Sequence, residues 1–387
     1  MSSLLEHAQR MAPQLIAIRR ELHRHPEIAF EEVRTSQTAA EWCERLGLTV
    51  RRGCAKTGVI AVLNADQPGL AVALRADMDA LPIHEENRVD YRSTVDGKGH
   101  LCGHDAHTTM LMGAASLLAE RREQLPFPVH FFFQPAEEIP CGGAKKLIEE
   151  GHLNGIGEIF GLHVNPQLPV GVLGLREGTT MASMDRFEIH VAGVGGHGAM
   201  PHHAHDPITT AAEIILALQT VVSRRIDPLD PVVVSCCQLE AGSAFNVIPQ
   251  SCRIVGTARS LSAQVREQFP KLIEDIATGV ARAHGLQARC EYLHGTPVLV
   301  THAGPTRQFA QAMRALGGKD CEIRPTMGGE DFAYYLERVP GSFAFIGAGN
   351  GSAETGSCLH HPRFNIDEGV LPWGSALLAQ VVLDRVR

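Results

Sequence analysis

Residues 129–138 read VHFFFQPAEE, and the prediction of the fold starts from them. The first part, Val129–Phe133, is a short and largely apolar run, which is typical of a strand buried inside a parallel sheet. A Gln-Pro pair ends this strand, and Glu137 and Glu138 follow directly. Because ligands of such sheets bind beyond the carboxyl ends of the strands, we expect chemistry near this pair of glutamates.

Helical and strand patterns alternate on both sides of this strand. The spacing of apolar residues predicts helices over Leu4–Leu22, Thr35–Leu46 and Thr108–Arg122, and strands over Val59–Leu63, Leu70–Leu74, Ile159–Val164 and Val170–Leu175. Such alternation is typical of an α/β domain with a mostly parallel central sheet covered by helices.

From about Met184 the order of elements changes to β-α-β-β-α-β, the split βαβ pattern of a four-stranded sheet with two helices on one face. The expected strands are Arg186–Val191, Pro231–Leu239, Cys252–Arg259 and Leu286–Leu293, and the expected helices are Ile208–Arg225 and Ser262–Ala283. The α/β pattern then resumes, and it ends in a helix near Gly369–Leu383. We therefore expect an α/β domain in two segments, 1–183 and 298–387, with an α+β domain inserted at 184–297.

The composition excludes several classes of protein. Of the 387 residues, 44% are hydrophobic and 20% are charged, so a large buried core is expected. The net charge is −8 and no basic block is present, which argues against nucleic acid or an anionic membrane as a partner. The N-terminal stretch is charged throughout, and the apolar runs are too short to span a bilayer. These features predict a soluble, cytoplasmic protein.

Ten cysteines are spaced irregularly, without a CxxC pair. In a chain of this kind they are expected to be reduced thiols. Most of them, including Cys236, Cys237, Cys252 and Cys290, are expected to be small buried hydrophobic residues.

Four short segments contain residue types that bind metals, either after strands or in glycine-rich loops. They are GHLCGHDAH (99–107), QPAEE (134–138), GLH (161–163) and LHHP (359–362). Each is a weak signal alone, since a single histidine is more often structural and a glutamate pair is usually solvated. Together they offer thiolate, imidazole and carboxylate groups, a mixture that suits Zn²⁺ or another first-row divalent ion.

The adjacent glutamates suggest a division of labour. Glu138 would bind metal, while Glu137 would take a proton from a metal-activated water and return it to the leaving group. A serine nucleophile is not supported, because the sequence has no G-x-S-x-G elbow. Cys102 paired with His104 is a conceivable nucleophile, but a thiolate beside so many other ligand types is more economically a metal ligand.

In order along the chain, the motifs ADMDALP (76–82), CGHDAH (102–107), QPAEE, GLH, GGHGAMPH (195–202), FNVIP (245–249) and LHHPRF (359–364) resemble the aminoacylase/carboxypeptidase-like metallo-amidohydrolases. The most similar branch contains hippurate hydrolases, other N-acyl-amino-acid amidohydrolases and plant auxin-conjugate hydrolases. The resemblance extends from RHPE (24–27) to the C-terminal helix.

This resemblance implies a site for two divalent metal ions, manganese or zinc. The residues that match the family's ligands are Cys102, His104, Glu138, His163 and His360, with Cys102 in the place of a bridging carboxylate. His360 is preferred to His361, because the family pattern has a variable residue between the ligand and the proline. Glu137 matches the general base. Asp79 is expected to orient a ligand histidine, and Asp77 is not expected to be a ligand.

The inserted domain resembles the family's lid and dimerisation domain. The resemblance implies that His197 helps to polarise the scissile carbonyl in the neighbouring subunit, and that Asn246 and Arg259 hold the carbonyl oxygen and the substrate carboxylate. The alternative for Arg259 is a charged side chain on the surface of a strand, without a role in function. Residues 193–198 also fit G-x-G-x-x-G, but Pro201 and Pro207 prevent the helix that a dinucleotide site needs.

The function predicted from these observations is hydrolysis of the amide bond of small N-acyl-amino acids by a homodimer or larger homo-oligomer. A dipeptidase or carboxypeptidase of the same fold is the first alternative. A non-catalytic protein that binds metal or a small molecule is the second, and Glu137 beside a full ligand set argues against it. The acyl group and the amino acid are left open.

Overall fold

The computed structural model describes residues 3–386 and divides them into two compact units. The larger unit comprises the described residues up to Gly178, residues 300–324 and those from Asp331 onward. The smaller unit comprises Thr179–Leu299 and Pro325–Glu330. Among the described residues, no helix is long and apolar enough to cross a membrane.

The larger unit is built on an eight-stranded sheet with the order β1-β2-β4-β3-β5-β16-β6-β15. The neighbours β4 and β3, β3 and β5, β5 and β16, and β6 and β15 are parallel, so the sheet is mostly parallel as the sequence predicts. The strands are β1 (Thr49–Cys54), β2 (Gly58–Leu63), β3 (Ala71–Asp77), β4 (Val129–Gln134), β5 (Ile156–Pro169), β6 (Val172–Leu175), β15 (Lys319–Glu322) and β16 (Gly341–Gly349).

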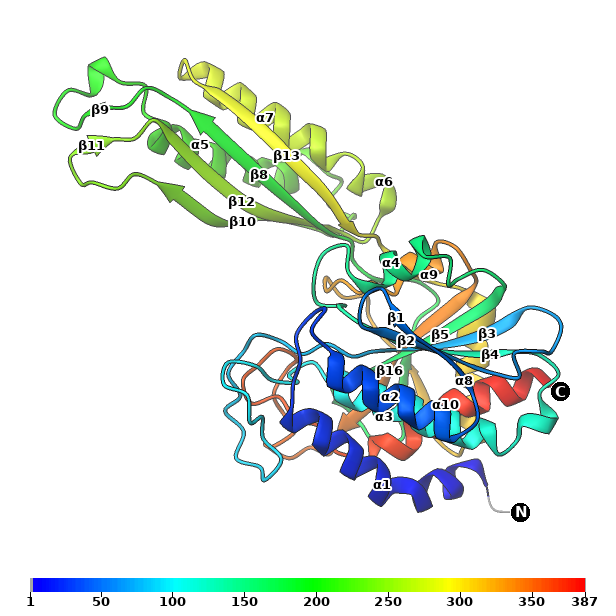
Figure 1. Cartoon of the computed structure of the whole chain (residues 1–387). Helices are drawn as coiled ribbons and strands as arrows, with labels where there is room; N and C mark the ends of the chain where they lie inside the picture. The colour runs from blue at the N-terminus through cyan, green and yellow to red at the C-terminus, as the bar shows by residue number, and fades with distance from the viewer. Residues whose placement is uncertain (1–2, 387) are drawn as a thin grey trace. The chain divides into compact units, whose positions relative to one another are not determined.

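Helices cover this sheet, and α1, α3 and α10 pack against one another on one face (Figure 1). Every residue of β3 is buried, as is nearly every residue of α3, which places the core between them. The helices are α1 (Leu4–Arg24), α2 (Val33–Arg45), α3 (His104–Ala119), α4 (Gly143–Glu149), α8 (Ala303–Ala315), α9 (Ala333–Leu336) and α10 (Val370–Leu383), with short turns η1 (Arg122–Gln124) and η4 (Asp384–Val386).

The smaller unit has an antiparallel four-stranded sheet with the order β10-β12-β8-β13. Apolar side chains of this sheet pack against α5 and α7, which lie on the same face (Figure 1). A two-stranded ribbon of β9 and β11 lies beyond one end of the sheet. The strands are β8 (Met184–Ala192), β9 (Gly196–His197), β10 (Val232–Ala241), β11 (Val247–Ile248), β12 (Ser251–Ser260) and β13 (Gln287–Thr296), and the helices are η2 (Pro201–His203), α5 (Pro207–Thr220), η3 (Val221–Arg225), α6 (Ala263–Arg266) and α7 (Phe269–Ala283). Strands β7 (Gly178–Met181) and β14 (Leu299–Thr301) span the boundaries of the units in the chain.

Three local predictions were wrong. Helix α3 begins at His104 rather than Thr108, because Gly103 adopts a left-handed φ of 95° and starts the helix earlier. The single helix predicted over Ser262–Ala283 divides into α6 and α7, because Pro270 cannot bond to the carbonyl of Arg266. Of the four cysteines named as buried only Cys252 is, whereas Cys237 is exposed and Cys236 and Cys290 are partly buried, since these three lie on the edge strands β10 and β13.

Candidate metal centre

The carboxyl ends of three parallel strands meet at one edge of the larger sheet. Strand β3 ends at Asp77, which pairs in register with Gln134 at the end of β4. Glu137 and Glu138 follow β4 after a short turn, and His163 lies in β5, the other neighbour of β3. The strand order therefore brings together groups that lie far apart in the sequence.

Cys102 and His104 reach the same place from the start of α3. Gly103 lies between them, and a Cβ atom there would come within 2.4 Å of the Val164 side chain. Because glycine has no Cβ and tolerates a positive φ, the loop can pass close to β5 with both ligand-type side chains beside that strand.

Two groups of three potential ligands share Cys102. The first contains Cys102, His104 and His163, and the second contains Cys102, Glu138 and His360. Within each group one ligand atom from every residue lies within 4.8 Å of the others. These residues are the five ligands that the family resemblance implies, and Cys102 is common to both groups. Asp77 with His104 and His107, and His104 with Glu137 and Glu138, meet the same distance criterion.

His163 is held in the tautomer that a ligand needs. Its Nδ1 donates to the carbonyl oxygen of Val164 at 2.9 Å, so its Nε2 keeps a free lone pair. That Nε2 lies 3.4 Å from the Sγ of Cys102. Burial lowers the pKa of His163 well below its usual value, which keeps the imidazole neutral.

His104 lies among several carboxylates. Burial lowers its pKa, but Asp77, Asp79 and Glu138 outweigh this effect and raise the pKa to about 10. Neither ring nitrogen of His104 has a hydrogen-bond partner among the described residues, and the same holds for Oε1 of Glu138. Buried polar atoms normally have partners, and Nε2 of His104 lies 3.9 Å from Oε1 of Glu138, so a cation near these two atoms would satisfy both.

The thiol and the second glutamate respond to the same surroundings. Burial and the nearby carboxylates of Glu138, Glu137 and Asp77 raise the pKa of Cys102 well above its usual value. Burial raises the pKa of Glu138. His360, at 3.3 Å, and His104 lower this pKa by more than burial raises it, so the net shift is downward. A divalent ion would reverse the effect on the thiol, because a coordinating thiol loses its proton.

Asp79 fixes the turn that carries both glutamates. Its Oδ1 accepts from the backbone N–H of Glu137 at 2.9 Å, and its Oδ2 accepts from that of Glu138 at 3.0 Å. Oδ1 also lies 3.4 Å from Nδ1 of His104. Ala136 has a φ of 54°, which is unusual for a residue with a side chain and turns the chain sharply after the strand.

The oxygens of Asp77 are already engaged within the protein. Oδ2 accepts from Nη1 of Arg75 at 2.5 Å, and Oδ1 lies 2.6 Å from Nδ1 of His107. The Nε2 of His107 accepts from the backbone N–H of Val164 at 2.9 Å, so both ring nitrogens of His107 are used as well. These bonds make His107 a support for β5, and that Asp77 is not a ligand stays a prediction, since Asp77 lies close to His104 and His107.

Sequence reasoning quoted His107 within its motif but gave it no role. Its place three residues after His104 on a helix is a usable signal, because such residues share one face. Asp331 was also missed. It accepts from Nη2 of Arg75 at 2.7 Å, and its backbone N–H lies 3.4 Å from Oε1 of Glu137. No sequence pattern connects positions so far apart.

The smaller unit holds the three predicted substrate-contacting residues at two separate places. His197 and Asn246 are exposed and lie together at the β9–β11 ribbon, where Gly198 N–H donates to the carbonyl of Asn246 at 2.8 Å. Arg259 is half-buried near the other end of β12, and its Nη1 donates to Oγ1 of Thr257 at 3.0 Å. Among residues 3–386, no carboxylate forms an ion pair with Arg259 within 4.0 Å.

Comparisons with known proteins identify the family of this chain and several similar proteins. The model for peptidase family M20/M25/M40 matches residues 73–384. An N-acetylcysteine deacetylase of Bacillus subtilis is 42% identical over 96% of this chain and 98% of its own length. The IAA-amino acid hydrolase ILR1-like 4 of Arabidopsis thaliana is 40% identical over 95% of this chain and 84% of its own length. The crystal structure of the Bacillus subtilis YXEP protein, described as a dinuclear metal-binding peptidase, superposes with a TM-score of 0.85 at 38% identity, over 98% of this chain and 99% of that one.

Proposed function

Because the chain belongs to peptidase family M20/M25/M40, we propose that it hydrolyses the amide bond of N-acyl-amino acids, giving a carboxylic acid and a free amino acid. The observation that supports this most is that a carboxylate oxygen of Glu137 lies within 4.8 Å of ligand atoms of His104 and Glu138, two of the five candidate ligands. The similarity of the chain to an N-acetylcysteine deacetylase and an IAA-amino acid hydrolase supports N-acyl-amino acids as the substrate class.

The ligand cluster fits two divalent ions. Cys102, His104 and His163 would hold one ion, and Cys102, Glu138 and His360 would hold the other. Such ions lower the pKa of water and polarise a carbonyl group. Manganese and zinc are the candidates, because the thiolate favours zinc by its softness and the resemblance favours manganese.

Glu137 would move the proton. Asp79 accepts a hydrogen bond from the backbone N–H of Glu137, and Oε1 of Glu137 faces the backbone N–H of Asp331. These contacts hold the backbone and the carboxylate of Glu137 in place. As general base it accepts a proton from the attacking water, and as general acid it delivers that proton to the amine nitrogen as the amide bond breaks.

The smaller unit would bind and polarise the substrate. The Nδ1 of His197 accepts from the N–H of Ala199 at 3.0 Å, so a neutral His197 carries its proton on Nε2 and can donate it to a developing oxyanion. Asn246 lies beside it and can donate to the same oxygen. Arg259, which lacks a carboxylate partner among the described residues, suits the substrate carboxylate as a planar bidentate donor.

The distance between these groups supports a homodimer. Along β12, Arg259 lies eight residues beyond Ser251, and the ribbon with His197 precedes Ser251. At about 3.3 Å per residue, Arg259 and His197 of one chain are more than ~25 Å apart. One small substrate cannot contact both groups of the same chain, so they belong to different sites. Following the family resemblance, we assign His197 to the site of a second copy. We also assign the protein to the cytoplasm, which its ten free cysteines support.

The test is a hydrolysis screen with chelated enzyme to which manganese, zinc or no metal is returned. N-Acyl-amino acids of varied acyl groups are compared with dipeptides of the same C-terminal residue. Metal-dependent release of the free amino acid from acyl conjugates supports the proposal. Preference for dipeptides would make the protein a dipeptidase, and no turnover of any compound by metal-loaded protein would favour a binding protein.

A further inference from the structure

A long loop beside the metal centre has no role in the function described so far. It comprises residues 82–98, which form no helix or strand. Leu81 and Gly99 close its neck with a pair of backbone hydrogen bonds, each 3.0 Å long. Long loops without regular structure in a compact domain usually have a function, so the contacts of this one are informative.

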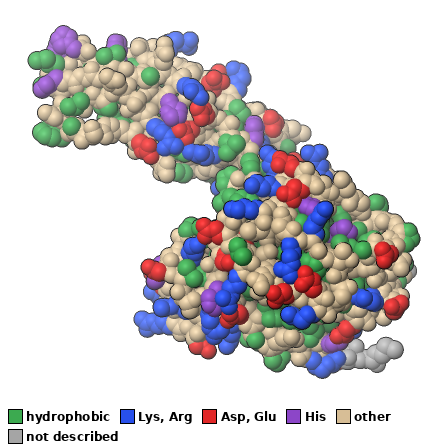
Figure 2. All heavy atoms as spheres, in the orientation of Figure 1, with side chains coloured by type: hydrophobic (Ala, Val, Ile, Leu, Met, Phe, Trp, Pro, Cys, Tyr) green, Lys and Arg blue, Asp and Glu red, His purple; other side chains and the backbone are tan. Residues whose placement is uncertain are grey.

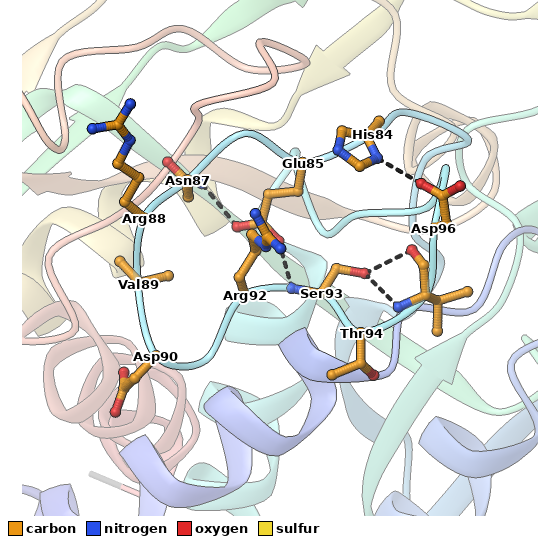
Figure 3. A pocket seen from close by; sticks show the side chains of 11 residues that line it. His84, Glu85, Asn87, Arg88, Val89, Asp90, Arg92, Ser93, Thr94 and Asp96 are labelled. Carbon is orange, nitrogen blue, oxygen red and sulfur yellow. Dashed lines mark hydrogen bonds and ion pairs between the residues drawn. The ribbon is translucent and has the colours of Figure 1, made fainter.

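Glu85 organises the inside of the loop. It is only 2% exposed, and its Oε1 accepts from Nδ2 of Asn87 at 2.9 Å while its Oε2 accepts from the backbone N–H of Ser93 at 2.7 Å. Figure 3 shows Glu85, Asn87 and Ser93 facing one another within the curve of the loop. The loop residues line a hollow of about 510 Å³, so hydrogen bonds rather than dense packing hold this side of the loop.

The loop is also bonded to the segment that carries His360. Nδ2 of Asn87 donates to the carbonyl oxygen of Phe364 at 2.8 Å. The backbone N–H of Glu86 donates to the carbonyl oxygen of Pro362, also at 2.8 Å. Tyr91 and Asn365 add a hydrogen bond between their side chains. These bonds matter because the His360 backbone is itself unusual, with a φ of 65°.

Glu85 has a second connection toward the start of α3. Its Oε1 lies 3.1 Å from Nε2 of His23, and Nδ1 of the same ring lies 2.8 Å from Oδ2 of Asp105. Asp105 directly follows His104, and Nε of Arg19 lies 2.7 Å from the same Oδ2 of Asp105. These four side chains are buried, so Glu85 contacts supports of both ligand-bearing segments.

We propose that Glu85 and Asn87 are positioning residues that fix His360 at the metal position formed by Cys102, Glu138 and His360. The proposal rests on the two-metal function above. His360 depends on this support more than the other ligands do, because its side chain is half exposed and its segment has no regular secondary structure. His104 belongs to α3, His163 belongs to β5, and Cys102 is buried just before α3, so their metal position should depend less on the loop.

The experiment is a metal titration of chelated Asn87→Ala, measured by competition with a chromophoric chelator that resolves two binding steps. Asn87→Ala removes the bond to Phe364 without touching a ligand. We expect one of the two dissociation constants to rise about 10- to 100-fold, the usual effect of losing a support of a ligand, while the other stays unchanged. Glu85→Gln should weaken the same step most and the other step less, because Glu85 also contacts His23, which bonds to Asp105 beside His104.

Activity provides a second measure. If the defect is one of positioning, turnover of the variants falls at limiting metal and recovers at saturating metal. His84→Ala is the matched control, because His84 lies in the same loop, is exposed and bonds only to Asp96 among the described residues. This variant should keep both wild-type dissociation constants.

Two results would overturn the proposal. One is two unchanged dissociation constants in Asn87→Ala. The other is equal weakening of both steps with a lower melting temperature of the metal-free protein, which indicates general damage to the fold. A wild-type protein that binds fewer than two ions would contradict the proposed function instead, and the two failures are thereby distinguished.

Discussion

The two units differ in the burial of their candidate functional residues. In the larger unit, Cys102, His104 and His163 are buried, and hydrogen bonds from backbone and side chains fix their surroundings. In the smaller unit, His197 and Asn246 are exposed on a two-stranded ribbon, and Arg259 is half-buried without a carboxylate partner among the described residues.

This contrast separates two tasks. The candidate metal ligands of the larger unit come from one chain, and buried atoms of His104 and Glu138 have no hydrogen-bond partner among the described residues. The proposed substrate-binding groups of the smaller unit are exposed or half-buried, so water can solvate them until a substrate arrives. A buried polar atom without a partner is costly, so the buried atoms of the larger unit are the ones that we expect a cation to satisfy.

The largest effect is expected from the two adjacent glutamates of the larger unit. Glu137→Gln should lower kcat by about 10²–10⁴-fold, the usual worth of a positioned general base, and should keep the metal content of the wild type. Glu138→Gln should lose metal as well as activity. Metal analysis of both purified variants checks this, and the opposite pattern of metal loss would exchange the two roles.

Mixed dimers test whether the exposed ribbon serves another chain. Glu137→Gln and His197→Ala should each be nearly inactive alone. After random exchange about half of the dimers are mixed, and in each of these one site has both defects and the other has neither, so about a quarter of the wild-type activity should return. Subunits are exchanged by coexpression or refolding. A verified mixed dimer without activity would place His197 in its own chain's site.

A smaller effect is expected at Arg259. Arg259→Ala should raise KM about 10- to 100-fold, because a hydrogen bond to a charged group contributes about 1.5–3 kcal/mol, while kcat changes less. A substrate amide in place of the carboxylate provides the control, since its hydrolysis should not distinguish the variant from the wild type. A variant that discriminates between the two substrates as the wild type does would remove Arg259 from carboxylate binding.

The smallest effect is expected at Cys237, the exposed thiol of the smaller unit. Cys237→Ser should change the free energy of unfolding by no more than ~0.5 kcal/mol and should keep the thiolate-to-cobalt absorption band of cobalt-loaded protein. Cys102→Ser should lose that band, because Cys102 must bind as the thiolate. An absorption band that is lost in Cys237→Ser would contradict the account, because it would place the metal site in the smaller unit.

The sequence was sufficient where periodicity or chain order determines the outcome. The run at Val129–Phe133 predicted a buried strand, and the structure has it as β4 with the two glutamates just beyond its end. The alternation from Met184 predicted the four-stranded sheet of the smaller unit. Metal-ligand residue types in four segments were also enough to group the candidate ligands before their distances were known.

The supports of the site could not be predicted in the same way. Glu85 and Asn87 act through the carbonyl of Phe364, and Asp331 acts through Arg75, and these partners are far apart in sequence. Such contacts depend on how loops pack, which no periodicity encodes. The early start of α3 was missed for a local reason, because a glycine at the left-handed N-cap reads in sequence as part of a loop.

The central claim is that five side chains of the larger unit hold two ions with Cys102 between them. Anomalous diffraction from crystals grown with manganese or zinc tests it most directly. We predict two peaks that share the Sγ of Cys102, one bound by His104 and His163 and the other by Glu138 and His360, with Glu137 bound to neither. A single peak, or an ion ligated by Glu137 or Asp77, would contradict the account.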